Sequence, residues 1–239
     1  MSMMNHLFDD DIILLEPEHK YKLKSDPDFE FKSVTTLAAE YFEPFDGPAI
    51  AKNLVATYPK YKGMEVSTLL EEGDAARDFG IKVHNEIDLF LKDSVFPEES
   101  RSINAIDWLK KYKMKSEITI HSEVKIYSKE LNLAGTIDIL AHDTRTNKYE
   151  IIDWKTSKSI NKTSFGNKMG THEITNHLMD CKFVHYSMQL SFYRYLLEEY
   201  YGLNVNNQLI AHLDKNECVA HVADYHIQVV NDIINSQKN

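Results

Sequence analysis

The sequence has few of the residues that build covalent or thiolate-based frameworks. It contains 239 residues but only two cysteines, Cys181 and Cys218. Two thiols are too few for a disulfide framework, a four-thiolate zinc site or an iron–sulfur cluster. We therefore expect a protein of a reducing compartment that carries no iron–sulfur cluster.

Long apolar runs and targeting signals are also missing. No segment approaches the roughly 18 apolar residues that a membrane span needs. The first residues, MSMMNHLFDDDIILLEP, have no positively charged region and reach aspartates before a short apolar run. This pattern differs from that of a signal peptide or a mitochondrial presequence. The sequence therefore predicts a cytoplasmic protein that is not secreted and has no membrane partner.

Positive charge is scarce overall but clustered. The formal net charge is −10, which argues against non-specific binding to phosphate backbones as the main activity. Lysines nevertheless gather without acidic neighbours in residues 155–170 and again in residues 108–115. Each cluster fits either a solvated surface or a phosphate contact. Trp108 and Tyr112, in the second cluster, either stack on unpaired bases or pack against a sheet.

The first part of the chain predicts short strands and one long helix. Near the N-terminus, apolar and polar residues alternate in short runs broken by two prolines, which favours small strands or a hairpin. Thr68 and Glu71 have the spacing of a capping box, and a helical pattern continues from there to about Lys92. His84 and Asp88 lie one turn apart at the edge of its apolar stripe.

From residue 117 the apolar pattern changes to period two. The runs EITIHSEVKIYS, LAGTIDILAHD and KYEIIDWKT predict three consecutive strands. A lysine-rich loop, a helix with Gly202 as its C-cap, a hairpin and a closing helix follow. This order indicates an α/β fold with a mixed central sheet flanked by helices. We assign residues 1–65 to an N-terminal appendage and residues 66–239 to the core of what is one domain overall.

Two aspartates end neighbouring strand patterns. Asp138 lies in GTIDIL and Asp153 in IIDWK, and a short turn makes these strands neighbours. Adjacent carboxylates repel and are costly to bury, but Mg²⁺ binds one or two of them and takes its other ligands from water and phosphate. Lys155 shares the face of Asp153, and Gly135 suits a β-bulge or a close backbone approach. The alternative is an ordinary aspartate at a strand end beside a lysine that reaches solvent.

The order of these residues resembles the PD-(D/E)xK nuclease superfamily, specifically its RecB-like branch. The branch is marked by a helical histidine, then G-x-x-D, then (D/E)-x-K, and then Q-x-x-x-Y. The resemblance covers roughly residues 75–202 and is nearest to phage-type and mitochondrial-maintenance-type single-domain exonucleases. The matching positions are Gly80 and His84 in GIKVHNEID, Asp138 in GTID, Asp153 and Lys155 in DWK, and Gln189 and Tyr193 in QLSFY.

The resemblance implies a restriction-endonuclease-like core and a deoxyribonuclease that depends on Mg²⁺ or Mn²⁺. By this resemblance, Asp138, Asp153 and Lys155 are the catalytic residues, with Lys155 assisting the attacking water. The implied metal ligands are His84, Asp138, Asp153 and the main-chain carbonyl of Trp154. Taken alone, a histidine such as His84 is more often a hydrogen-bonded residue at the edge of a core.

The resemblance also suggests residues around the metal. Asp88 stands where relatives often have glutamate and is expected to accept a hydrogen bond from His84. Glu123 is expected either to make an outer contact with the site or to lie on the strand surface. Contacts with nucleic acid are expected from Gln189, Tyr193, Thr156, Ser157 and Lys158.

The expected activity is exonucleolytic hydrolysis of phosphodiester bonds at DNA ends or in single strands, during replication, recombination or repair. The sequence has no G-x-x-x-x-G-K-[ST] motif, so unwinding requires a helicase, a single-strand-binding protein or a recombination protein as a partner. By resemblance, a phage or viral protein in the host cytoplasm is one setting. The alternatives are a structure-specific endonuclease on the same fold, a non-catalytic DNA-binding recombination accessory protein, and a small-phosphate hydrolase.

Overall fold

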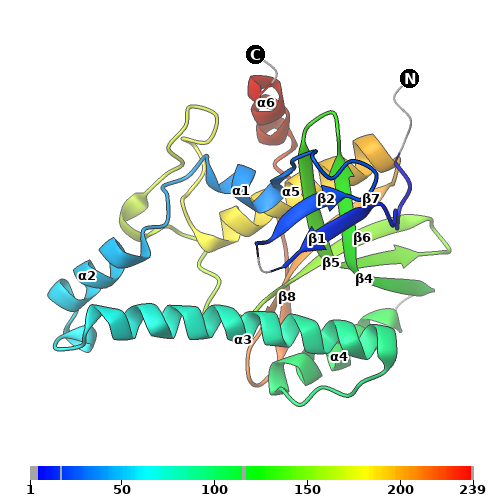
Figure 1. Cartoon of the computed structure of the whole chain (residues 1–239). Helices are drawn as coiled ribbons and strands as arrows, with labels where there is room; N and C mark the ends of the chain where they lie inside the picture. Colours follow the sequence, from blue (N-terminus) through cyan, green and yellow to red (C-terminus); the bar gives the residue numbers. More distant parts are fainter. Residues whose placement is uncertain (1–4, 17, 115–116, 238–239) are drawn as a thin grey trace.

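A computed structural model describes residues 5–16, 18–114 and 117–237 of the chain. Pro17, one of the two prolines that break the N-terminal strand pattern, and Lys115 of the second lysine cluster lie outside these residues. Figure 1 shows a central sheet with helices on both of its faces. The prediction of a mixed sheet flanked by helices is therefore confirmed.

Groups of strands and helices follow one another along the chain, and the colours of Figure 1 give their order. The strands are β1 Ile12–Leu15, β2 Lys20–Leu23, β3 Lys32–Ser33, β4 Ile118–Ser128, β5 Leu133–Asp143, β6 Lys148–Lys155, β7 Val205–Leu213 and β8 Cys218–Val222. The helices are α1 Val34–Ala39, α2 Gly47–Thr57, α3 Val66–Asp93, α4 Ser100–Lys113, α5 Lys182–Tyr201 and α6 Ile227–Gln237, with 3₁₀ turns at Pro59–Tyr61 and Phe165–Asn167.

The main sheet has the order β3-β5-β6-β7-β8, with β4 paired to the other edge of β5. Strand β4 follows β5 antiparallel along its whole length, whereas β6 pairs with β5 only from Ile139 onward. Strand β3 then pairs in parallel with Leu133 and Ala134 at the start of β5. Between these two partners, residues 135–138 of β5 have no neighbouring strand on that edge, which leaves an opening within the sheet. This opening positions the candidate site.

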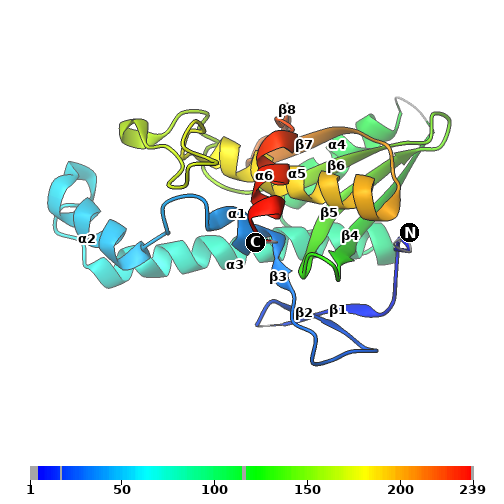
Figure 2. The ribbon, with the colours of Figure 1, turned by 90° about the horizontal axis from the view of Figure 1, so that it is seen from above.

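Each face of the sheet is covered by its own helices and core. Helices α1, α5 and α6 pack on one face over a core that includes Phe192 and Ile210. Helices α3 and α4 pack on the other face over Val83, Leu109 and Trp154. Figure 2, seen from above, shows α5 and α6 on one side of the sheet and α3 on the other. Side chains reach the opening from both faces.

Strand β4 changes the face to which its side chains point at Glu123. Ile118 and Ile120 pack against the core under α3 and α4, whereas Val124 and Ile126 belong to the core under α5. These positions differ by even numbers and would share one face of a regular strand. Glu123 has a left-handed backbone with φ 50°, which reverses the alternation at this point. Such a conformation costs about 1–3 kcal/mol in a non-glycine residue.

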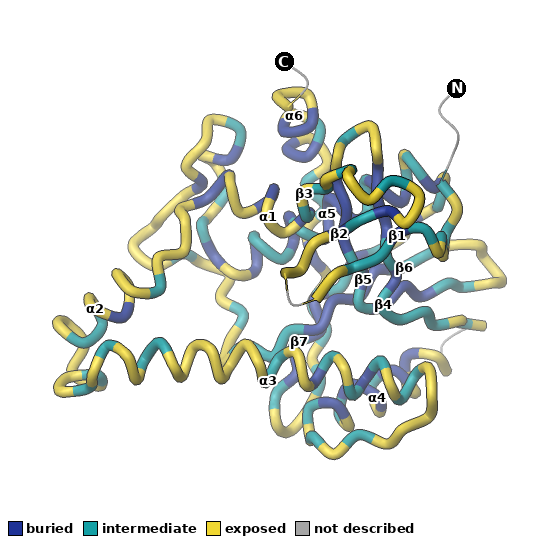
Figure 3. Tube along the Cα trace, viewed as in Figure 1, coloured by how far each residue is buried: buried dark blue, intermediate teal, exposed yellow. Residues whose placement is uncertain are grey.

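Outside the sheet, the N-terminal half of α3 and the helix α2 form an arm. Both extend from the same end of the molecule as the loop between β6 and α5 in the two views of Figures 1 and 2. Most of the arm is exposed in Figure 3, in contrast to the C-terminal half of α3 under the sheet. Within the described part of the chain, no helix is long and apolar enough to cross a membrane.

Most predicted elements are confirmed, with two corrections. The three consecutive strands, the β7–β8 hairpin and the closing helix are present, and Gly202 caps α5 with φ 66°. The capping-box prediction at Thr68 is wrong, because α3 begins at Val66 after Glu65. Helices α2 and α4 were not predicted, although Asp46 and the glycine and proline after it are typical of a helix start. The division at residues 65 and 66 stays a prediction.

Candidate active site

Three carboxylates lie side by side across three neighbouring strands. The ladder pairs on either side place Glu123 of β4 opposite Asp138 of β5. The last pair between β5 and β6 is Ile139 with Ile152, so Asp138 and Asp153 come one residue beyond it, where the two strands separate. Like charges directly opposite each other destabilise a sheet. The arrangement therefore needs a compensating cation or proton.

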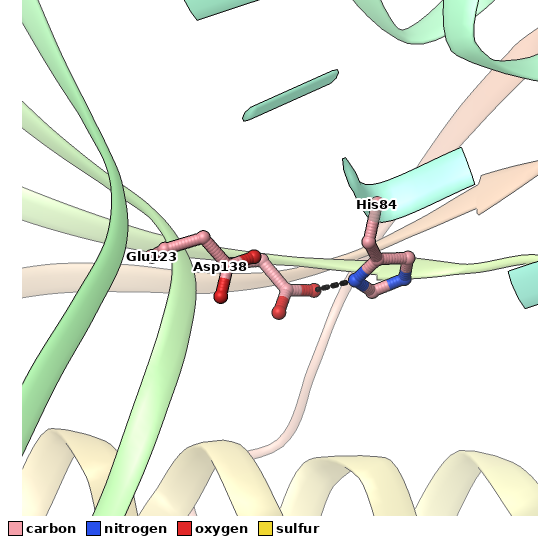
Figure 4. A group of neighbouring side chains, drawn as sticks. All are labelled: His84, Glu123 and Asp138. Atoms are coloured by element: carbon pink, nitrogen blue, oxygen red, sulfur yellow. Dashed lines mark ion pairs between the residues drawn. The ribbon is translucent and has the colours of Figure 1, made fainter. Parts of the chain in front are cut away.

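His84 reaches this group from α3. Its Nδ1 atom lies 3.5 Å from Asp138 Oδ2, and Figure 4 marks this ion pair with a dashed line. The ligand atoms that His84, Glu123 and Asp138 can offer lie within 4.8 Å of one another. Val83 and Ile87 hold this part of the helix, because both are buried against the sheet. Among the described residues, this is the group that has the spacing of a metal site.

The charges within this group are unbalanced. Burial raises the pKa of Glu123 to about 7, and the Asp138 carboxylate adds to the increase. Burial also acts to raise the pKa of Asp138, but attraction to His84 outweighs it and leaves the pKa lowered. Conversely, burial acts to lower the pKa of His84, and Asp138 reverses that effect. His84 therefore compensates the negative charge of Asp138, whereas the charged form of Glu123 is disfavoured by its burial and by Asp138.

Asp153 and Lys155 form a second, buried ion pair. Lys155 Nζ lies 2.6 Å from Asp153 Oδ2 and 4.6 Å from the centre of the Tyr186 ring. Burial raises the pKa of Asp153 to about 6 despite the opposing effect of Lys155. Burial acts to lower the pKa of Lys155, but Asp153 outweighs it and leaves the pKa raised. Lys155 therefore stays charged beside the opening.

Trp154 links the two aspartates through its backbone. Its amide N–H donates to Asp138 Oδ2 at 2.7 Å, so the main chain of β6 faces β5 at the point where their ladder ends. Its side chain is 2% exposed and packs edge to face against Trp108, on the face of the sheet that α3 and α4 cover. Trp108 in turn stacks on Tyr112. For these two aromatic residues, the structure supports packing rather than stacking on unpaired bases.

Gln189 and Tyr193 approach from α5. Gln189 Nε2 donates to Asp153 Oδ1 at 3.2 Å and to the Tyr193 hydroxyl at 3.2 Å. Tyr193 is buried and lies against Gly135, where an added Cβ would be 2.4 Å from its ring. The close backbone approach expected at Gly135 is thus present. Both residues line the cleft, and Gln189 binds Asp153 directly, while their contact with DNA stays a prediction.

The surroundings of Asp88 and Glu123 differ from the expectations. Asp88 accepts a hydrogen bond from Ser122 Oγ at 2.7 Å and pairs with Lys92 Nζ at 2.9 Å. Among the described residues, His84 forms no hydrogen bond to Asp88. The expectation that Asp88 holds His84 is therefore wrong, and Asp88 instead binds Ser122 of β4. Glu123 was expected to make an outer contact with the site or to lie on the strand surface, but the structure places it with His84 and Asp138 in the candidate metal group.

Two residues that the sequence did not indicate hold the segment after Lys155. Arg101 Nη1 donates to the carbonyl oxygen of Thr156 at 2.9 Å. His212 Nε2 lies 2.6 Å from the carbonyl oxygen of Ser157, which can only accept, so this nitrogen carries the proton. Their distance along the chain from the residues they hold explains why no local signal indicates them.

A cleft of about 1680 Å³ surrounds these residues. Its walls come from α3, the β1–β2 hairpin, the start of α1, the segment after β6 and the start of α5. The sequence-predicted residues His84, Asp138, Asp153 and Lys155 all line it, as do the expected nucleic-acid contacts Thr156, Ser157, Lys158, Gln189 and Tyr193. Asp88 is not among its lining residues. The structure thus gathers most of the predicted site along one cleft.

Comparison with known proteins assigns the family. No curated protein matches the chain. A solved structure described as the crystal structure of SSO0001 is similar at 13% sequence identity, over 87% of this chain and 77% of that chain, with a TM-score of 0.35. The model of the PD-(D/E)XK nuclease superfamily matches residues 98–227, more than half of the chain, including Asp138, Asp153, Lys155 and Gln189. The chain therefore belongs to the PD-(D/E)XK nuclease superfamily, whose members are metal-dependent nucleases.

Proposed function

We propose that this protein is a deoxyribonuclease of the RecB-like branch, dependent on Mg²⁺ or Mn²⁺, that works as an exonuclease at DNA ends or in single strands. The observation that carries the proposal is the alignment of Glu123, Asp138 and Asp153 across the opening in the sheet. His84 pairs with Asp138, and Lys155 pairs with Asp153. A site of this composition suits hydrolysis of a phosphodiester.

The donor set fits a divalent cation. His84, Glu123 and Asp138 offer one nitrogen and two carboxylate oxygens at compatible spacing, and Asp153 stands at the same opening. Hard cations prefer carboxylate oxygen, and Mn²⁺ also accepts imidazole nitrogen. Burial and the nearby Asp138 carboxylate raise the pKa of Glu123, so a cation bound there would stabilise its charged form. When bound, such a cation polarises the phosphate and lowers the pKa of a coordinated water.

The protein's own groups position the reaction. Lys155 is held by Asp153 and by the face of Tyr186, so its charge is fixed before substrate arrives. A preorganised ammonium stabilises the negative charge that develops on a phosphoryl oxygen. Gln189 fixes the orientation of Asp153 through its other carboxylate oxygen. Together these contacts place one positive charge beside the attacked phosphate without reorganisation during the reaction.

The biological setting follows from the substrate. An exonuclease without its own motor acts on ends or single strands that a helicase, a single-strand-binding protein or a recombination protein exposes. Replication, recombination or repair of DNA, in the cytoplasm of a cell or of a phage or virus host, provides such ends. The net charge of −10 makes delivery of DNA by a partner advantageous, because the protein as a whole repels polyanions.

The test uses labelled linear and covalently closed circular DNA with Mg²⁺, Mn²⁺ or EDTA. We expect the wild type to degrade linear DNA only with metal, and Lys155→Ala to lose about 10²- to 10³-fold in rate. Lys148→Ala, on the exposed start of the same strand, is the matched control and keeps full activity. Equal rates for wild type and Lys155→Ala would refute the proposal. Cleavage of closed circles would instead identify an endonuclease, and an RNA strand in parallel tests the preference for DNA.

A further inference from the structure

The segment directly after Lys155 is held in one conformation from three sides. Arg101 binds the carbonyl of Thr156 at 2.9 Å, and His212 binds the carbonyl of Ser157 at 2.6 Å. On the third side the segment packs on α3 at Gly80, where an added Cβ would lie 3.1 Å from Thr156 Oγ1. Residues 156–158 are therefore not simply the start of a loose loop.

These contacts bind the carbonyl groups of Thr156 and Ser157 and leave backbone N–H groups of the segment free. In the part of the chain that the structure describes, the backbone N–H groups of Ser157 and Lys158 donate to no protein acceptor. Both residues line the cleft. Successive backbone amides with free N–H groups bind anions, and phosphate oxygens are suitable acceptors. The segment thus presents donors toward the space where substrate lies.

Arg101 adds a charge to the same wall. One guanidinium nitrogen donates to Thr156, and the guanidinium carbon lies 4.9 Å from the centre of the Phe79 ring. Among the described residues no carboxylate lies within ion-pair distance of Arg101, although it lines a cleft whose walls carry five carboxylates. An arginine has five N–H donors in a planar fork that suits phosphate. Most of these donors remain available.

We propose that Arg101 and the backbone amides of Ser157 and Lys158 form a subsite for a second phosphate of the nucleic-acid strand, next to the phosphate that is cleaved. The proposal rests on the proposed nuclease function and names a requirement of that site: a substrate with at least two phosphates. Three extended residues span about 10 Å, so the subsite lies within about three nucleotides of the cleaved bond. His212 and Gly80 act as positioning residues for this subsite.

The first experiment compares a short single-stranded oligonucleotide with bis(p-nitrophenyl) phosphate, a diester with a single phosphate. Loss of one charged hydrogen-bonding group weakens binding by about 10- to 100-fold. We expect Arg101→Gln to raise KM for the oligonucleotide by this factor, with kcat changed much less. The ratio of oligonucleotide to small-diester activity falls at least tenfold. Arg145→Gln removes the same charge from the exposed β5–β6 turn and serves as the control.

The second experiment needs no variant and so does not depend on the folding of one. Single neutral methylphosphonate linkages are placed in turn along the oligonucleotide. We expect one position within three nucleotides of the cut, besides the cleaved linkage itself, to reduce cleavage about tenfold or more in the wild type. In Arg101→Gln the same replacement has little further effect. The slope of binding affinity against salt concentration on a log–log plot also decreases by about 0.7 for single-stranded DNA.

The outcomes separate the two proposals. An inactive wild type on both substrates refutes the nuclease function itself. An active wild type with no sensitive position other than the cleaved linkage overturns the subsite alone. Equal losses by Arg101→Gln on the oligonucleotide and the small diester also overturn it, because a distorted catalytic centre affects both. A selective loss together with one sensitive neighbouring phosphate supports the subsite.

Discussion

Replacing Glu123 by glutamine should make the metal-free protein more stable near neutral pH. The folded-state pKa of Glu123 is raised from 4.5 to about 7, because the side chain is buried beside Asp138. A raised carboxyl pKa means that the folded state holds its proton more tightly than the unfolded state. Its contribution is therefore present below pH 4.5 and is lost as the pH rises through 7. Each pKa unit corresponds to 1.36 kcal/mol, so the loss amounts to at most about 3 kcal/mol.

The assay is urea unfolding in EDTA at several pH values between 4.5 and 8. We expect the free energies of unfolding of the wild type and Glu123→Gln to be similar at pH 4.5. They should then diverge until the variant is more stable by up to about 3 kcal/mol at pH 8. Glu117→Gln, on an exposed residue just before the same strand, is the matched control and should follow the wild type.

Metal should reverse this difference. At a free Mn²⁺ concentration one hundred times the dissociation constant, the wild type gains about 2.7 kcal/mol, and the variant gains less because it has lost a ligand. Parallel pH profiles of wild type and Glu123→Gln in EDTA would refute the reasoning. They would show that Glu123 does not face Asp138 in the folded protein. Equal stabilisation of both proteins by Mn²⁺ would remove Glu123 from the metal site.

Three further predictions concern the support of the site. Gly135→Ala places a Cβ 2.4 Å from the Tyr193 ring and should cost about 1–3 kcal/mol, measured by urea unfolding. Trp154→Ala removes a side chain that is 2% exposed and should lower the free energy of unfolding by about 3–5 kcal/mol in the same assay. Gln189→Ala frees the carboxylate of Asp153 and should reduce the nuclease rate about 10- to 100-fold with little change in thermal midpoint. An unchanged rate would remove Gln189 from the support of the site.

Local sequence patterns were sufficient for much of the fold and for part of the site. Alternating apolar residues predict β4, β5 and β6, and a short turn between two strands makes them antiparallel neighbours. Asp138 and Asp153 therefore had to lie close together. Gln189 and Tyr193 share a face because they are four residues apart on a helix. In each case the information lies within one element or one hairpin.

Other contacts depend on elements that are far apart in the sequence. Arg101 and His212 each hold a residue 55 positions away, and no spacing in the chain indicates either pairing. Asp88 was expected to support His84, but the rotation of α3 against the sheet brings it to Ser122 instead. The rotation of a helix on a sheet is set by the packing of whole faces, which a single stripe of apolar residues does not specify.

The sequence by itself determined that Asp138, Asp153 and Lys155 meet, because strand alternation and hairpin connection are local properties. Only the tertiary structure decided that these groups face an open space. Strands β3 and β6 share one edge of β5 and leave residues 135–138 without a partner strand on that edge, while Glu123, with its left-handed backbone, offers its carboxylate to the same group as His84 and Asp138. The division of that edge depends on pairings between distant segments, so it emerges only when the whole sheet has assembled.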